Sequence, residues 1–276
     1  MKYINKHLYI EKIRVDRIAK KYGTPIYCYS LDALRKNIQD FKKNFKSFSP
    51  LICFSVKSNF NIQILKEIKK MGIGADVVSK GELMAALKAG IAPNKIVFSG
   101  IGKTFDEIKY AVENNILLIN AESESEVREI EKISRIKKKV TNIGLRLNPN
   151  IDAKTLKEIS TGKYEDKFGI TELILLKILK KFRNSKYLNI SCLSVHIGSQ
   201  ITDYRPYIKM VNVLSKLIKK SKHKFDYVDL GGGMGIKYEH KTKKLNYKKY
   251  EKKIQKFLKE NKVKIIFEPG RSIIAD

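Results

Sequence analysis

The sequence contains few cysteines and no long apolar run. Its three cysteines, Cys28, Cys53 and Cys192, are odd in number and far apart, which excludes a metal-binding spacing and a disulfide framework. We predict that all three are small buried apolar residues. No apolar run approaches the roughly 18 residues that a membrane span needs, and the first residues lack the apolar stretch of a signal peptide. The sequence therefore predicts a soluble, cytoplasmic protein that does not contact membranes.

Acidic residues are also scarce, because 28 Asp and Glu stand against 57 Lys and Arg, a formal net charge of +29. Such an excess is typical of proteins that bind polyanions. However, only nine of the 57 are arginines, the residue that nucleic-acid readers favour, and the lysines are spread along the chain. The densest stretch, 237–264, also has a helical apolar stripe, so its lysines occupy the solvent face; the stripe consists of Tyr250, Ile254, Phe257 and Leu258. We therefore expect no specific nucleic-acid partner.

Apolar residues make up 43% of the chain, enough for a packed core and against intrinsic disorder. From about residue 50 onward, short β-branched runs alternate with amphipathic helical stretches. This alternation implies parallel strands joined by right-handed crossovers, and eight such strands predict a closed (β/α)8 barrel of the TIM type. The predicted strands are 51–56, 74–78, 95–99, 117–120, 142–147, 191–197, 227–230 and 264–267.

Local signals mark where several helices begin. Residues 104–107 and 123–126 both have the pattern of a capping box. Thr171 precedes an apolar helical repeat that ends near Lys180 and Lys181, whose charges suit the negative end of a helix dipole. These signals place helices between the predicted strands.

The first 45 residues precede the barrel pattern. A helical repeat over 15–22 stops at Gly23 and Pro25, residues 26–29 are strand-like, and Ser30 is placed to cap a helix. The chain shows no internal repeat and no linker-like segment. We predict a lead-in of a helix and a strand followed by one barrel domain, with the bounds 1–45 and 46–276.

Residues that carry chemistry follow the predicted strands, where barrels place their active sites. Lys57 follows the first strand; alone it would be a surface lysine, but a lysine partly desolvated at a barrel mouth can form a Schiff base with an aldehyde cofactor. Gly231, Gly232 and Gly233 follow the seventh strand. Barrels frequently bind phosphate there, and glycines can present backbone N–H groups to it.

The eighth strand is followed by Glu268, Pro269, Gly270 and Arg271. Pro269 and Gly270 predict a tight turn, so that Glu268 points into the barrel mouth while the amides of Gly270 and Arg271 face a phosphate. A carboxylate in that position could keep a pyridine nitrogen protonated. Arg271 could pair with a substrate carboxylate.

His196, at the end of the sixth strand, would usually be structural if it stood alone. Because it lies at a strand end beside glycine and serine, we predict that it stacks on or hydrogen-bonds to a ligand. Asp76, Glu82 and Arg146 are expected to point toward the same mouth. An Asp–Arg pair there could equally be a structural ion pair, and both interpretations stay open.

Together these motifs resemble the fold-type III PLP-dependent decarboxylases, which share the barrel of alanine racemase and ornithine decarboxylase. The superfamily is marked by 55–59, 196–200, the three glycines and 268–271. Within it, 160–162 and 167–170 are similar to the diaminopimelate branch, whereas ornithine and arginine decarboxylases diverge there.

The resemblance implies pyridoxal 5'-phosphate (PLP) as cofactor and an amino-acid substrate, with decarboxylation of meso-2,6-diaminopimelate to L-lysine and CO2. Lys57 would form the Schiff base with PLP, His196 would stack on the ring, and Glu268 would contact the ring nitrogen. Arg271 would also bind a substrate carboxylate. The further cofactor-binding residues would be Asp76, Arg146, Ser199, Gly231, Gly232, Gly233, Pro269, Gly270 and Arg271.

Members of this family continue into a β-rich C-terminal domain, which supplies catalytic and substrate-binding groups, partly across a homodimer interface. This chain ends just after the eighth predicted strand, so we expect that domain to be absent from it. Three alternative functions stay open: a non-catalytic PLP-binding barrel, an ornithine- or arginine-type decarboxylase, and, on charge alone, a polyanion-binding module.

Overall fold

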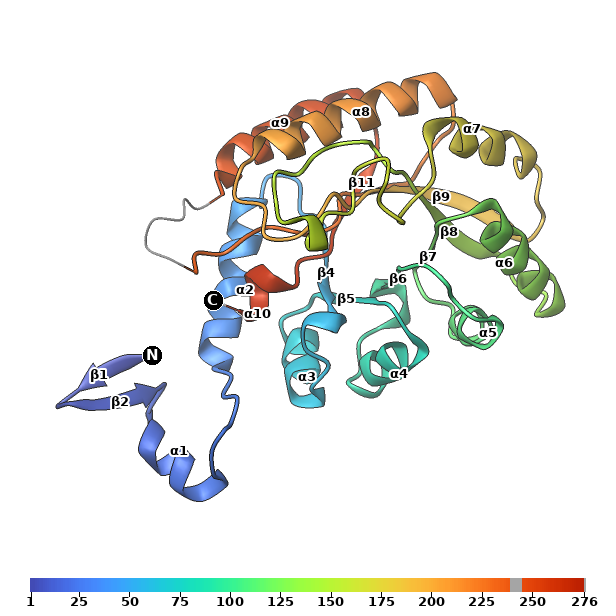
Figure 1. The fold of residues 1–276 in the computed structure, drawn as a ribbon. Helices are drawn as coiled ribbons and strands as arrows, with labels where there is room; N and C mark the ends of the chain where they lie inside the picture. The colour runs from blue at the N-terminus through green and yellow to red at the C-terminus, as the bar shows by residue number, and fades with distance from the viewer. Residues whose placement is uncertain (239–244, 276) are drawn as a thin grey trace.

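Eight parallel strands close into a barrel in the computed structural model, which describes residues 1–238 and 245–275 (Figure 1). The order around the barrel is β10-β11-β4-β5-β6-β7-β8-β9, with β9 paired to β10. All eight predicted strands are confirmed, with ends that differ by three residues or fewer. The strands are β4 (Leu51–Ser55), β5 (Gly74–Val77), β6 (Ile96–Phe98), β7 (Leu118–Ala121), β8 (Thr141–Arg146), β9 (Leu188–Ser194), β10 (Tyr227–Asp229) and β11 (Lys264–Phe267).

Helices surround the barrel and bury their apolar faces against the strands (Figure 1). In α3, for example, Leu65 and Ile68 are fully buried. The α-helices are α1 (Val15–Tyr22), α2 (Leu31–Asn44), α3 (Ile62–Lys70), α4 (Lys80–Lys88), α5 (Phe105–Glu113), α6 (Glu124–Ile136), α7 (Glu172–Lys181), α8 (Arg205–Ser221), α9 (Tyr247–Glu260) and α10 (Arg271–Ile274). Three 3-10 helices add short turns, η1 (Val56–Ser58), η2 (Pro93–Lys95) and η3 (Lys157–Ile159).

The core has two layers. Inside the barrel, Cys53 and Cys192 pack with Val97, Leu118 and Ile266, all fully buried. The larger layer lies between the strands and the helices, and aromatic rings of α2 and α9 gather there around Phe267.

The lysine-rich stretch behaves as predicted where it is described. Tyr250, Ile254 and Phe257 of α9 are buried and Leu258 is partly buried. Lysines of the same helix face outward, so the helical stripe is confirmed. Residues 239–244 of this stretch, like Asp276, lie outside the described residues.

The first residues form a small sheet that the sequence did not predict. Its antiparallel strands are β1 (Lys2–Ile4), β2 (His7–Ile10) and β3 (Ile13–Arg14), and it lies beside the barrel rather than in it (Figure 1). Helix α1 ends at Gly23 and Ser30 caps α2, as predicted. Residues 26–29, however, form no strand because no neighbouring strand pairs with them. Cys28 lies in this segment and is exposed, so the prediction of its burial is wrong.

Helix caps account for where the outer helices begin. Thr104 and Glu107 form the predicted reciprocal capping box of α5, and Thr171 caps α7. The second predicted box is only half formed: Ser123 accepts from the Glu126 amide. The Glu126 carboxylate binds elsewhere, to the Glu122 amide and the Lys103 ammonium.

Replacing Thr104 by Ala should lower the free energy of unfolding by about 1 kcal/mol, because the Glu107 N–H in the first turn of α5 loses its acceptor, the Thr104 hydroxyl. Thr104→Ser keeps the hydroxyl and should stay close to wild type. Urea unfolding of the two variants measures the difference. Equal stability of Thr104→Ala and Thr104→Ser would contradict this account of the cap.

Among residues 1–238 and 245–275, no helix combines the length and the apolar character needed to cross a membrane. The same residues contain no group of three or more His, Cys, Asp or Glu side chains arranged to hold a metal ion.

Candidate functional site

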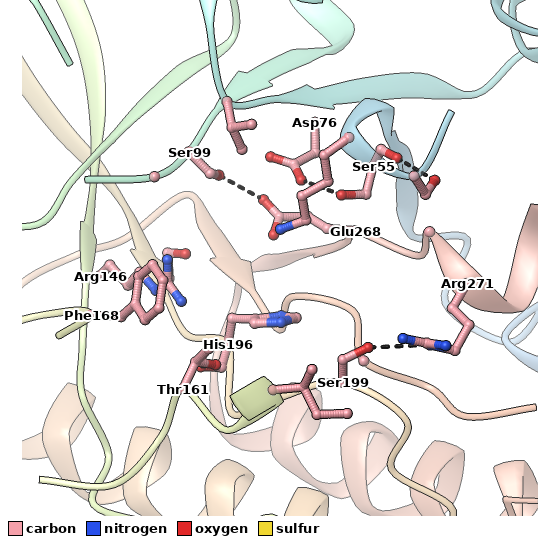
Figure 2. Close-up of a pocket in the computed structure, with 18 of the residues that line it drawn as sticks. Ser55, Asp76, Ser99, Arg146, Thr161, Phe168, His196, Ser199, Glu268 and Arg271 are labelled. Carbon is pink, nitrogen blue, oxygen red and sulfur yellow. Dashed lines mark hydrogen bonds between the residues drawn. The ribbon is translucent and has the colours of Figure 1, made fainter. Parts of the chain in front are cut away.

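A pocket of about 640 Å³ opens at the carboxyl ends of the barrel strands (Figure 2). It gathers predicted residues from six strand ends, which are far apart in the sequence. Gly231, Gly232 and Pro269 do not line it. The predicted residues that do are Lys57, Asp76, Arg146, His196, Ser199, Gly233, Glu268, Gly270 and Arg271.

Lys57 stands on η1, the turn that follows β4. Its side chain is exposed at the pocket, so the expected partial desolvation is wrong. Within the described part of the chain, its ammonium has no hydrogen-bond partner or ion pair. Its charge nevertheless acts on the carboxyls of Asp76 and Glu268. A lysine so placed has its nitrogen free to react with a bound ligand.

Buried carboxyl groups form the floor of the pocket. Asp76, on β5, is 2% exposed and accepts a hydrogen bond from the Ser55 hydroxyl at 2.9 Å. Glu268, directly after β11, is 8% exposed and accepts from the Ser99 hydroxyl at 3.1 Å (Figure 2). One oxygen of Asp76, Oδ1, is buried without a hydrogen-bond partner. A polar ligand atom would satisfy it.

Asp229, on β10, is a third buried carboxyl beneath the pocket, and it is not among the site residues predicted from the sequence. It accepts hydrogen bonds from the Asn120 amide and the Ser194 hydroxyl, both at 3.2 Å, and from the Gly231 N–H at 2.9 Å. The sequence signal that could have identified Asp229 is an acidic residue at the carboxyl end of an apolar strand, two residues before three glycines. This carboxyl completes an acidic cluster with Asp76 and Glu268.

The pKa of each carboxyl in this cluster is raised. Burial raises the pKa of Asp76 to about 7, and the charge of Glu268 adds to the rise. Burial also raises the pKa of Asp229. The pKa of Glu268 is raised well above its usual value, first by burial and then by the neighbouring charge of Asp229. The cluster therefore resists carrying three negative charges at once.

His196 is held neutral and in one tautomer. Its Nδ1 accepts the Gly232 N–H at 3.1 Å, so Nε2 carries the ring proton. Burial lowers the pKa of His196 well below its usual value, and the charges of Lys57 and Arg146 act in the same direction. The ring lies across the pocket from Glu268 (Figure 2). It offers a ligand a flat, uncharged surface.

The three glycines allow strand ends to approach closely. A Cβ on Gly232 would lie 2.1 Å from the Glu268 carbonyl oxygen, and one on Gly233 would lie 2.0 Å from that of Gly198. The expectation that every amide of the triplet faces a phosphate is wrong for two of them. The Gly231 N–H already binds Asp229, and the Gly232 N–H binds His196.

Backbone donors remain free beside Arg271. In the part of the chain that the structure describes, the N–H groups of Gly233, Gly270 and Arg271 have no acceptor. The Arg271 guanidinium donates to the Ser199 hydroxyl at 3.3 Å and to the Tyr238 hydroxyl (Figure 2). Free amides and a guanidinium on one rim form a place for an anionic group.

Arg146 has a buried carboxylate partner, but it is Glu122 rather than Asp76. The two side chains, 8% and 3% exposed, form an ion pair of 2.8 Å. The other oxygen of Glu122 accepts the Gly169 N–H at 2.9 Å, and the guanidinium stacks on Phe168, 4.7 Å from the ring centre (Figure 2). Arg146 thus forms a buried ion pair and also lines the pocket, so its role in binding a cofactor stays a prediction.

Glu82 does not reach the pocket. Its carboxylate turns back to accept the Val78 N–H at 2.9 Å, at the start of α4. The expectation that it points into the mouth is wrong, because the Val78 N–H, two residues before α4, supplies a nearer partner.

Comparisons with known proteins agree with this geometry. The family model "Pyridoxal-dependent decarboxylase, pyridoxal binding domain" matches residues 31–275. Diaminopimelate decarboxylase of Aquifex aeolicus is 38% identical over 282 residues, covering 100% of this chain and 66% of the relative. That of Helicobacter pylori strain J99 is 39% identical, covering 95% and 65%. The chain thus spans slightly less than two thirds of these relatives.

Solved structures give the same result. Diaminopimelate decarboxylase from Helicobacter pylori complexed with L-lysine aligns with a TM-score of 0.90 and 38% identity, over 94% of this chain and 66% of that chain. The arginine decarboxylase of the Paramecium bursaria Chlorella virus aligns with a TM-score of 0.79 at 21% identity, over 94% and 68%. The second likeness shows a shared fold alone.

The residues present fit PLP. A buried carboxyl cluster with an unpartnered oxygen suits a ring nitrogen that carries a proton, and the free amides beside Arg271 suit a phosphate. Lys57 is free to meet an aldehyde. The volume of about 640 Å³ lies within the range of small-molecule sites.

Proposed function

Because the chain belongs to the family of pyridoxal-dependent decarboxylases, we propose that it takes part in converting meso-2,6-diaminopimelate to L-lysine and CO2. The observation that carries this proposal is the meeting of Lys57, Glu268 and Arg271 around one pocket. The names of the relatives support the substrate. When bound, PLP supplies an electron sink for the pair of electrons left behind by CO2.

The chain's own residues have separate tasks in this proposal. Lys57 offers a free amine to the cofactor aldehyde, and the neutral ring of His196 supports the face of the cofactor. Glu268 keeps a proton at the ring nitrogen, which strengthens the electron sink. Asp76, with one unpartnered oxygen, helps to orient the same end of the ring.

Arg271 is the residue that we expect to bind an anionic group. Its guanidinium is held by Ser199 and Tyr238, two neutral hydroxyls, so its charge is not neutralised by a carboxylate. A substrate carboxylate or the cofactor phosphate can therefore pair with it, and neither has to displace an existing ion pair.

A decarboxylation assay tests the proposal. The chain, supplied with PLP, is incubated separately with meso-2,6-diaminopimelate, ornithine and arginine, and the CO2 released is measured. We expect release from diaminopimelate only, abolished by Lys57→Ala and kept by Lys88→Ala, an exposed lysine at the end of α4. Release from ornithine or arginine instead would reassign the substrate. Bound PLP without any CO2 would favour a non-catalytic PLP-binding barrel.

The proposal also includes a homodimeric assembly, which the family resemblance implies, and the cytoplasmic location that the sequence predicts. Light scattering of the purified chain with PLP tests the first. A mass of twice the 31.8 kDa chain is expected, and a monomer at micromolar concentration would contradict it. Fractionation of the cells that express the protein tests the second.

A further inference from the structure

The carboxyls of Asp229 and Glu268 meet inside the barrel on neighbouring strands. Strand β10 pairs with β11, and the backbone bond from Glu268 N–H to the Gly231 carbonyl oxygen, 2.8 Å long, continues that pairing beyond the strands. The pKa of each of the two carboxyls is shifted by a side-chain interaction with the other. Asp229 is fully buried, so water cannot separate the two groups.

Neutral hydrogen-bond donors tie the same two carboxyls together. The Asn120 amide donates to Ser99 at 3.1 Å and to Asp229 at 3.2 Å, and the Ser99 hydroxyl donates to Glu268 at 3.1 Å. Gly144 makes room for this amide, since a Cβ there would lie 2.0 Å from Asn120 Oδ1. The pair is therefore held in a fixed arrangement.

No positive charge lies within ion-pair distance of either carboxyl in the described part of the chain. Two adjacent buried carboxylates would then repel each other in a medium of low dielectric constant, and one proton between them removes that repulsion. The titratable and charged groups on the surrounding elements that interact electrostatically with the pair are Lys57, Asp76, Arg146, Cys53, Cys192 and Tyr250.

We propose that Asp229 is a positioning residue that shares one proton with Glu268, and that this proton moves to a pyridine nitrogen when the cofactor docks against Glu268. The proton leaves the carboxyl pair and forms the N–H bond of the ring, and no other bond changes. The total charge inside the barrel stays the same, because the pair gains one negative charge while the ring gains one positive charge. This inference rests on the proposed function only for the destination of the proton.

The hydrogen-bond donors to Asp229 explain which of the two carboxyls holds the shared proton. Three groups stabilise the negative charge of Asp229, namely Asn120, Ser194 and the Gly231 N–H, whereas Glu268 accepts from Ser99 alone. The shared proton therefore resides mainly on Glu268, which lines the pocket, and not on Asp229, which lies beneath it. Asp229 keeps the proton on the side from which a ligand can receive it.

Infrared titration of the cofactor-free chain tests the shared proton, because a protonated carboxyl has its own C=O absorption. At a pH where an ordinary glutamate is ionised, the wild-type chain should show an acid band that is missing in Glu268→Gln. In Asp229→Asn the midpoint of its loss should fall by about one pH unit or more, since a like charge is removed. Asp226→Asn, an exposed acid three residues earlier on the chain, should leave the midpoint unchanged. A wild-type spectrum identical to that of Glu268→Gln would overturn the proposal, as would an unchanged midpoint in Asp229→Asn.

A milder variant covers the case in which Asp229→Asn does not fold. Ser194→Ala removes one donor to Asp229, so the ionised form of Asp229 loses support and the shared proton should move from Glu268 toward Asp229. The acid C=O band should therefore shift in frequency, and a band identical to that of the wild-type chain would overturn the proposal.

Adding the cofactor tests where the proton goes. PLP should remove the acid band of Glu268, while an analogue with CH in place of the ring nitrogen should leave it. If PLP binds and the band persists, the transfer is overturned. If PLP does not bind at all, the proposed function fails, and the titration of the cofactor-free chain still decides whether the pair shares a proton.

Discussion

Glu122→Gln should lower the free energy of unfolding by about 3–5 kcal/mol, the usual cost of leaving one member of a buried ion pair alone. Arg146 would keep its charge, 8% exposed, without a carboxylate. Gln cannot replace the acid, because its single oxygen can serve either Arg146 or the Gly169 N–H, and its amide would face the other donor.

Chemical denaturation of Glu122→Gln measures this loss, with Glu124→Gln as the matched control. Glu124 is two residues further on and pairs with Lys181 and Arg128 at the surface. Its substitution should cost much less, because water screens an ion pair at the surface. The double variant Glu122→Leu with Arg146→Met should be more stable than Glu122→Gln, since no charge is left unpaired. A loss in Glu122→Gln no larger than in Glu124→Gln would contradict this account.

The cofactor-free chain should lose stability as the pH rises from about 4 to about 7, partly through Asp76. Burial raises the pKa of this carboxyl from 3.8 to about 7 in the folded chain. Between these values the folded state binds a proton that the unfolded state has released, so unfolding becomes easier with each pH step. Above pH 7 both states are ionised, and this contribution becomes constant.

Asp76→Asn isolates the effect because Asn does not titrate. Relative to wild type, the variant should gain stability between pH 4 and 7, by at most about 4 kcal/mol. Ser55 can still donate to the amide oxygen, which keeps the local hydrogen bond. Thermal unfolding of both chains across this range, with Asp226→Asn as the exposed control, measures the gain. A stability difference that does not change with pH would contradict the raised pKa.

The barrel could be predicted from the sequence because its signals are local and repeated. Each strand is a short apolar, β-branched run followed by a helical pattern, and Thr104 and Thr171 mark two of the helix starts. The N-terminal sheet lacked such signals. Its strands are two to four residues long and mostly exposed, so no apolar alternation marks them.

The site was predicted by residue type and place, but its contacts depend on which strands are neighbours. Arg146 ends β8 and Glu122 directly follows β7, so their pairing appears only once these two strands lie side by side. Asp229 has no partner close in sequence, since Asn120 and Ser194 come from other strands. The motif around Lys57 led to the expectation that its side chain is partly desolvated. The exposure of that side chain depends on the loops around it, which the motif does not specify.

The central claim is that this pocket holds PLP through Lys57. The most direct test is to mix the chain with PLP, reduce any imine with borohydride, and locate the added mass by peptide mapping. The account predicts modification of the peptide that contains Lys57, lost in Lys57→Ala and kept in Lys88→Ala. The account would be contradicted if the added mass were distributed over many surface lysines, or if the modification were unchanged in Lys57→Ala.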